Sequence, residues 1–328
     1  MPRYLLHHRH ESHECITLER GEDNAPLVPR YVTAARTPQE VAMSNRPPTE
    51  AKSRLSSLIQ RRPLASFFVL AYAMTWLLWT PLVVSGGGSP TGFGVVLQGL
   101  GSLVPSAVAI ALIALLHGKA GVRTLLRRLL IWRVGVGWWL AVVSLSTLPL
   151  GAIGLSVLLG GDFPDVADTI PGIVFLFLFS IFPGSSGGEE LGWRGFALPH
   201  LQAGRSALGA SVVLGVVWGV WHLPLYLLGA DIRPLSLFAA WVPLTVALSV
   251  FLTWMYNGTG GSLLIVVLFH AAINLPLTVL LQPLAEEDQL TQPFLILVAL
   301  LILAAAVVVA AAGPANLSRT RAKQVAVP

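Results

Sequence analysis

The sequence predicts an all-α protein, a polytopic bundle of about eight transmembrane helices. Hydrophobic residues make up 54% of the 328 residues and charged residues only 11%, whereas soluble domains average about 25% charged residues. Two long stretches, residues 63–118 and 234–285, contain no Asp, Glu, Lys or Arg. Apolar stretches of this length can cross a bilayer as helices. Their continuity excludes a transmembrane barrel, which would require alternating apolar and polar residues.

The apolar runs between helix-breaking residues predict eight spans, of which the fourth is irregular. They cover residues 64–84, 92–117, 135–159, 171–201, 207–228, 235–256, 261–283 and 291–312. The fourth span contains the run Pro183-Gly-Ser-Ser-Gly-Gly188. Proline and glycine are both unfavourable inside a helix. Between the second and third spans, arginines alternate with leucine pairs over residues 122–133. This pattern predicts an amphipathic helix that lies at the membrane interface.

The remaining polar segments suggest the domain organisation. Residues 1–60 are polar and lack a lasting apolar period, so we expect an N-terminal extension that is poorly ordered. Residues 61–313 are then the transmembrane domain, and residues 314–328 are a short cytoplasmic tail. A single cysteine, Cys15, excludes an intrachain disulfide framework.

The distribution of charge predicts the orientation in the membrane. Basic clusters precede the first span and follow the second, fourth and eighth spans, whereas the acidic residues after position 62 gather mainly in the opposite loops. Because basic loops stay inside, we expect an integral protein of the cell membrane with both termini in the cytoplasm. The net charge of +5 is therefore a feature of membrane topology, and we expect no nucleic-acid partner.

Three of the predicted spans carry polar residues that a bilayer disfavours. The fourth contains Glu189, Glu190 and Arg194, the fifth His222, and the seventh His270 and Asn274. Measured from the cytoplasmic ends, Glu189 lies about 21 Å deep, His222 about 24 Å, and His270 and Asn274 about 15 and 21 Å. Ionisable groups inside a membrane are expensive and mark functional sites. Their similar depth predicts one shared intramembrane cavity.

The spacing within each helix suggests a role for each group. Glu190 and Arg194 are four residues apart and can pair. Glu189 then points about 100° away from Glu190, and we expect it to be unpaired and to act as a general base for water.

Two further spacings complete the predicted cavity. Trp218 and His222 share a helix face, so the indole can form a wall beside the imidazole. His270 and Asn274 also share a face and offer two neutral donors to a developing oxyanion.

These residues resemble the CPBP family of intramembrane proteases, which includes the CAAX prenyl protease 2 type and bacteriocin-processing or immunity (Abi-like) proteins. Its motifs EExxxR, FxxxH and HxxxN/B are matched in order by Glu189 to Arg194, Trp218 to His222, and His270 to Asn274. The motifs fall within residues 185–280, and the resemblance extends over residues 64–312. The second motif departs from the family because Trp218 stands where Phe is usual.

The resemblance implies an intramembrane endopeptidase that hydrolyses a membrane-associated peptide or a lipidated protein. Glu189 and His222 would activate the water, and His270 and Asn274 would stabilise the oxyanion. Glu190, Arg194 and Trp218 would be structural or orienting.

Two alternatives accompany this prediction. Many family members are described as metalloproteases, and Glu189, His222 and His270 could bind zinc. We favour a metal-free mechanism without a cofactor, because the chain has neither HExxH nor a further carboxylate that accompanies the histidines and would orient them. The rival function is a non-catalytic membrane protein, either an immunity or partner-binding factor or a transporter. A transporter should show more intramembrane ionisable residues and paired broken helices.

Overall fold

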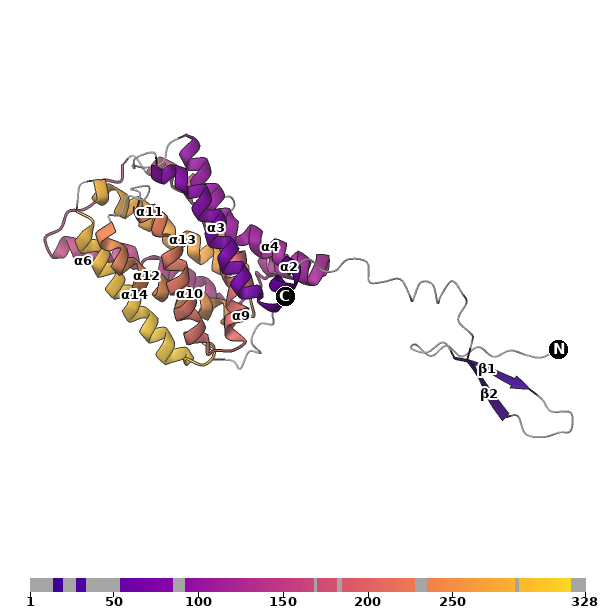
Figure 1. The fold of residues 1–328 in the computed structure, drawn as a ribbon. Coiled ribbons are helices and arrows are strands. Elements are labelled where there is room, and N and C mark those ends of the chain that lie inside the picture. Colours follow the sequence, from indigo (N-terminus) through magenta and orange to yellow (C-terminus); the bar gives the residue numbers. More distant parts are fainter. Residues whose placement is uncertain are drawn as a thin grey trace. The chain divides into compact units, whose positions relative to one another are not determined.

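The structure is a computed structural model. It describes residues 14–19, 28–33, 54–84, 92–167, 170–181, 185–227, 235–286 and 289–319. The chain divides into two compact units, Met1–Ser56 and Ser57–Pro328, of which the second contains every long helix described below (Figure 1).

The first unit contains a small antiparallel sheet. Strands β1 (Glu14–Glu19) and β2 (Val28–Thr33) pair in the register that sets Glu14 opposite Thr33. Two segments of the predicted extension therefore form a strand pair. Each strand is six residues long and contains β-branched residues, which favour strands. Six residues are too few to show a clear alternation of apolar and polar side chains in the sequence. The rest of the predicted extension, to residue 53, lies outside the described residues.

The second unit is all-helical, as predicted. Within the described residues, seven helical segments are long and apolar enough to span a membrane: Pro63–Leu82, Phe93–Leu130, Val136–Leu158, Ala207–Leu227, Leu235–Gly258, Leu263–Leu281 and Thr291–Ala312. The elements that form them are α3 (Pro63–Val84), α4 (Phe93–Arg127), η1 (Arg128–Leu130), α5 (Val136–Ser146), α6 (Leu148–Leu158), α10 (Ala207–Trp221), α11 (Leu223–Leu227), η4 (Leu235–Leu237), α12 (Phe238–Gly258), α13 (Leu263–Glu286) and α14 (Thr291–Ala312). A short helix, α2 (Arg54–Arg61), precedes them across the boundary between the two units. The chain is therefore an integral membrane protein of the polytopic helical class.

The predicted fourth span is broken into short pieces and is not among these seven. It comprises η2 (Ile170–Gly172), α7 (Ile173–Ile181), α8 (Ser185–Gly192), the π-helical turn η3 (Trp193–Ala197) and α9 (Leu198–Gln202). Glycine lowers the helix propensity of α8, but two of its glycines are required by packing. A Cβ at Gly188 would lie 2.7 Å from the Ser102 carbonyl oxygen, and one at Gly192 would lie 2.5 Å from that of Pro105. Helix α8 therefore packs backbone to backbone against α4.

The segment predicted as an interfacial helix, residues 122–133, continues α4 beyond a kink. Gly118 has a φ of 63°, a conformation that glycine adopts without strain. The helix ends at η1, so Trp132 follows it in an irregular segment. The expectation of a segment that lies on the surface is wrong for Arg128. Its side chain is buried and donates to the Tyr256 hydroxyl on α12, whereas Arg123 and Arg127 are exposed.

Helix α10 is held from two sides within the helical unit. Against α12, a Cβ at Gly215 would lie 2.5 Å from the Val246 Cα atom, so the two backbones are in close contact. From α3, Tyr72 donates to the Val217 carbonyl and Trp76 donates to the Trp221 carbonyl at 3.0 Å. These contacts determine where the last turn of α10 lies.

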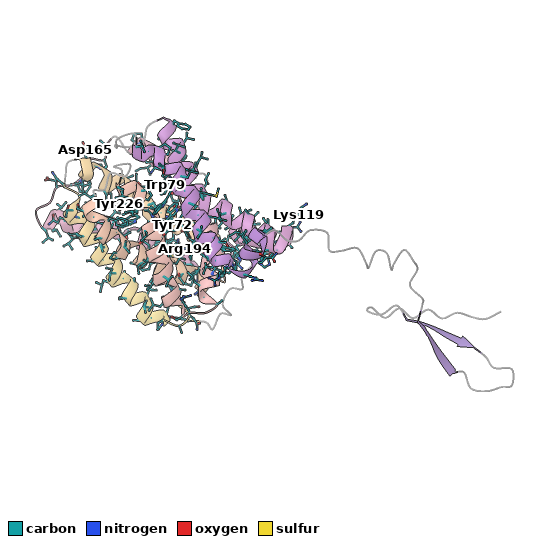
Figure 2. All side chains as sticks on the ribbon, in the orientation of Figure 1. Tyr72, Trp79, Lys119, Asp165, Arg194 and Tyr226 are labelled. Carbon is teal, nitrogen blue, oxygen red and sulfur yellow. The ribbon has the colours of Figure 1, made fainter. Side chains whose placement is uncertain are left out.

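Charged side chains of opposite sign lie at separate places on the helical unit. Lys119 and Asp165 are both exposed, and Figure 2 shows them near opposite ends of this unit. Arg194 lies between them in the interior and is fully buried. A buried arginine in this position requires a partner, and α8 provides it.

Candidate intramembrane active site

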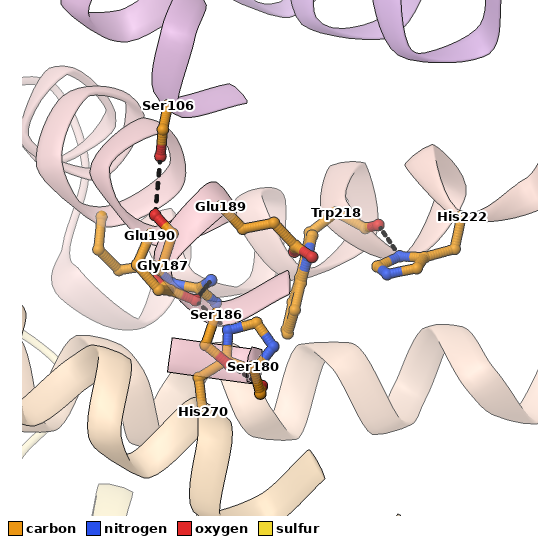
Figure 3. A network of polar contacts seen from close by, with 10 residues as sticks. Ser106, Ser180, Ser186, Gly187, Glu189, Glu190, Trp218, His222 and His270 are labelled. Atoms are coloured by element: carbon orange, nitrogen blue, oxygen red, sulfur yellow. Dashed lines mark hydrogen bonds and ion pairs between the residues drawn. The ribbon is translucent and has the colours of Figure 1, made fainter. Parts of the chain in front are cut away.

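The candidate site combines side chains from the broken segment, α10 and α13. Glu189 and Glu190 lie on α8, Arg194 on η3, and Trp218 on α10 (Figure 3). His270 lies on α13, and His222 directly follows the last residue of α10. The three predicted spans therefore bring their polar groups together, as their similar depth predicted.

The π-helical turn has a local cause in the sequence. Pro199 is the second residue of α9, and a proline inside a helix cannot donate to the carbonyl four residues earlier and clashes with it. That carbonyl belongs to Gly195, in the π-helical turn. Wider turns of this kind occur often at functional sites. Here the turn follows the two glutamates and contains Arg194.

Glu190 is the centre of a buried charged network. Its Oε1 atom accepts a hydrogen bond from Arg194 Nη1 at 2.8 Å and lies 2.7 Å from His270 Nδ1. Glu190 and Arg194 are 0% exposed and His270 is 2% exposed. The predicted pair of Glu190 and Arg194 is confirmed, but its connection to His270 on a helix 80 residues away is a finding of the structure. The network ties α8 to α13.

Glu189 is not unpaired, contrary to expectation. Its Oε2 atom accepts a hydrogen bond from the indole Nε1 of Trp218 at 2.6 Å, and Glu189 is only 1% exposed. The guanidinium carbon of Arg194 lies 4.5 Å from the centre of the same indole ring, within the range of a cation–π contact. Trp218 is therefore a hydrogen-bond donor as well as the predicted wall.

The hydrogen bond of His222 determines its tautomer. Its Nδ1 atom lies 2.8 Å from the Trp218 carbonyl oxygen. A carbonyl can only accept, so Nδ1 carries the proton and Nε2 of the neutral ring is an acceptor. His222 is partly buried, and its ring makes edge contacts with Trp218, Trp221 and Trp241. The aromatic surroundings limit the directions from which Nε2 can be approached.

The same reasoning applies to His270. Its Nδ1 atom faces the Glu190 carboxylate, so it donates from that nitrogen. With its proton on Nδ1, a neutral His270 offers Nε2 as an acceptor, and donation from Nε2 requires a second ring proton. The role of His270 as an oxyanion donor therefore remains a prediction. Asn274 lies one helical turn further along α13 and is partly buried.

Several polar atoms of the network have no hydrogen-bond partner among the described residues. They are Glu190 Oε2 and the Nε and Nη2 atoms of Arg194. Buried polar groups of this kind are commonly satisfied by internal water. The cluster therefore has one acceptor and two donor atoms that could bind water or a substrate.

The residues that could bind zinc do not form a ligand set in this conformation. In the described part of the chain, no group of three or more His, Cys, Asp or Glu side chains is placed to hold a metal ion. Glu189 accepts from the Trp218 indole, and His270 Nδ1 faces Glu190. The carboxylate of Glu190 beside His270 nevertheless contradicts one premise of the metal-free prediction, that no carboxylate accompanies the histidines.

Two contacts besides that between Glu190 and His270 were not foreseen from the sequence. One is the Trp218 indole as a donor to Glu189, although Trp in place of the usual Phe was a visible signal. The other is a hydrogen bond from Ser106 Oγ on α4 to the Gly187 carbonyl at 3.2 Å, which holds the turn before the glutamates. No local pattern predicts that bond, because the residues are 81 positions apart.

The fold and the buried cluster define a class: a polytopic helical membrane protein with a Glu, His and Arg network inside its bundle. Comparison with known proteins makes the class more specific. Residues 169–276 match the family described as type II CAAX prenyl endopeptidase, Rce1-like. This match includes all three motifs and confirms the resemblance to CAAX-type membrane proteases.

A second comparison supports the same family. The chain is 27% identical over 236 residues to CAAX prenyl protease 2 of Methanococcus maripaludis. The aligned region covers 64% of this chain and 82% of the relative. Similarity to that protein therefore extends well beyond the three motifs, and it supports a protease among the functions considered above.

Proposed function

We propose that the chain is an intramembrane endopeptidase that hydrolyses a peptide bond of a membrane-associated protein or peptide. The observation that carries the proposal is the juxtaposition of Glu189, Trp218 and His222 with the network of Glu190 and His270 inside the bundle. A carboxylate and an imidazole acceptor can activate water, and a nearby donor can stabilise the oxyanion of peptide hydrolysis.

In the proposed reaction, Glu189 and the Nε2 atom of His222 bind the attacking water. Glu189 takes a proton from this water as its oxygen attacks the carbonyl carbon of the peptide. The resulting tetrahedral oxyanion accepts hydrogen bonds from protonated His270 and from Asn274. The carbon–nitrogen bond then breaks, and the proton held by Glu189 passes to the leaving amine. Glu190 and Arg194 orient His270 and hold its charge.

The proposed substrate is a peptide or lipidated protein tail delivered from the bilayer. Helix α7 on the broken segment exposes large apolar side chains, with Val174 69% and Phe175 67% exposed, and it precedes the glutamates directly in the chain. An apolar surface of this kind would face the lipid of the bilayer. The lipid group of a modified tail would be held in the same bilayer, close to this surface. We further propose that the protein lies in the cell membrane with both termini in the cytoplasm.

Cleavage of a peptide pool by the purified protein in liposomes, followed by mass spectrometry, tests the proposal. The pool should include prenylated and unmodified C-terminal peptides. Glu189→Gln and His222→Ala should each abolish the cleavage that the wild type shows. Asp165→Asn is the matched control, because Asp165 is an exposed carboxylate outside the site, and it should cleave at the wild-type rate.

The same assay separates the alternatives. Cleavage that survives a zinc chelator supports the metal-free reaction, whereas cleavage that is lost on chelation and restored by zinc overturns it but keeps the protease. If no folded preparation cleaves any peptide of the pool, the proposal fails in favour of a non-catalytic immunity, partner-binding or transport protein.

A further inference from the structure

We propose that Trp218 is a positioning residue that aligns both groups of the water-activating pair. Its indole N–H holds the Glu189 carboxylate, and its backbone carbonyl holds the His222 ring. This inference rests on the proposed function and deepens it, because it assigns the alignment of the base and the imidazole to one residue of α10.

The indole is itself held rigidly, as a positioning group must be. Trp218 is 2% exposed, and its N–H donates to Glu189 Oε2 at 2.6 Å. Arg194 lies over the ring at 4.5 Å, and the ring of His270 contacts it at 5.2 Å with an interplanar angle of 84°. A ring confined by these two groups cannot turn away without breaking the network, so the carboxylate of Glu189 has one preferred place.

The backbone carbonyl of Trp218 is available to His222 because the helix ends there. Helix α10 stops at Trp221, and the backbone N–H of His222 donates to the Gly219 carbonyl at 3.2 Å. In a continued helix this N–H would bond the Trp218 carbonyl, since the pattern joins residues four apart. Helix ends leave such carbonyls without a backbone partner. The imidazole takes the place of the missing donor, which fixes its proton on Nδ1.

The chemistry of the side chain explains why tryptophan can do more here than phenylalanine. A phenyl ring provides an apolar wall but no hydrogen-bond donor, whereas the indole adds a single N–H. In the described part of the chain, that N–H donates to the Glu189 carboxylate. The departure from the usual FxxxH pattern at Trp218 therefore adds a contact to the proposed base and preserves the wall.

Two replacements at Trp218 test this role. Trp218→Phe removes the N–H together with part of the ring, and substitution of benzothienylalanine replaces only the N–H by sulfur and keeps the shape. A hydrogen bond to a charged group contributes about 1.5–3 kcal/mol, so each replacement should lower kcat by at least roughly tenfold. KM should stay within about twofold, because both replacements keep an aromatic wall at this position.

Trp79→Phe is the matched control. Trp79 is also fully buried and also donates an indole hydrogen bond, to the Gln98 carbonyl at 3.2 Å, but it lies outside the proposed machinery. Its variant should lose a similar amount of thermal stability and keep its kcat. This comparison separates a loss of alignment from a general loss of packing.

Each outcome decides one question. If the benzothienylalanine protein keeps the wild-type kcat, the positioning role is wrong, while Glu189→Gln still reports on the proposed function. If Trp218→Phe and Trp79→Phe lower kcat equally, Trp218 is structural and the inference fails. If the Glu189→Gln protein cleaves at the wild-type rate, the proposed function is wrong, irrespective of the results for the Trp218 variants.

Discussion

Arg194 Nη1 lies 2.8 Å from Glu190 Oε1, and neither side chain is exposed. Removing two charges from water is costly, so a buried pair often contributes little net stability compared with apolar residues. Breaking such a pair is a different matter, because it leaves one charge buried alone. The pair also adjoins His270 through the same carboxylate oxygen, so its geometry decides where α8 lies against α13.

Arg194→Met should therefore be among the most destabilising substitutions in the chain. We expect the free energy of unfolding to fall by about 3–5 kcal/mol, since Glu190 loses its buried partner. The double variant with Glu190→Gln should lose less than the sum of the two single variants, because they share one interaction. Unfolding in detergent measures both. Arg205→Met, at an exposed arginine, is the control, and an equal loss in it would contradict the prediction.

Gly188→Ala should displace α8 and reduce cleavage. The added methyl group would lie 2.7 Å from the Ser102 carbonyl oxygen on α4, and overpacking typically costs about 1–3 kcal/mol. Because Glu189 is the next residue, we expect kcat to fall as well as the melting temperature. Gly154→Ala on α6 has no atom within 4 Å of its new methyl group and should melt no lower than the wild type. Retention of full activity and stability by Gly188→Ala would show that the two helices can separate.

Asn257→Ala should weaken the end of the bundle without affecting chemistry. Asn257 Nδ2 donates to Gln202 Oε1 and to the Asn316 carbonyl, each at 2.8 Å. Its loss leaves the buried Gln202 amide without this partner, which costs about 1–3 kcal/mol. Asn316→Ala keeps the carbonyl that is used and should change stability by less than about 0.5 kcal/mol. Calorimetry and cleavage at low temperature provide the comparison, and equal melting temperatures for the two variants would refute it.

Cysteine labelling should reveal the orientation. In a Cys15→Ser background, Lys119→Cys and Asp165→Cys place single thiols at two exposed positions on the helical unit. With the basic loops inside, an impermeant maleimide added to intact cells should label Asp165→Cys, and Lys119→Cys should react after the membrane is opened. The reverse pattern would invert the proposed topology.

Much of the fold was predictable because the responsible signals are local. Continuous apolar runs predict spanning helices whatever their neighbours are, and the spacing of Glu190 and Arg194 is enough to predict their pairing. The irregular fourth span was also visible, from its glycines and prolines. By contrast, Arg128 was expected on the surface, since the pattern of its helix does not reveal that Tyr256 lies within reach.

The sequence by itself determined the membrane class, the approximate spans and the residues that meet in the bundle. The tertiary structure decided which atoms meet: the Trp218 indole with Glu189, and His270 with Glu190. Those contacts depend on the rotation and separation of neighbouring helices. The separation is set where glycines allow backbones to touch, as at Gly188 and Gly215. Hydrophobicity drives helices into a bilayer without specifying these distances, and only packing among all the helices does so.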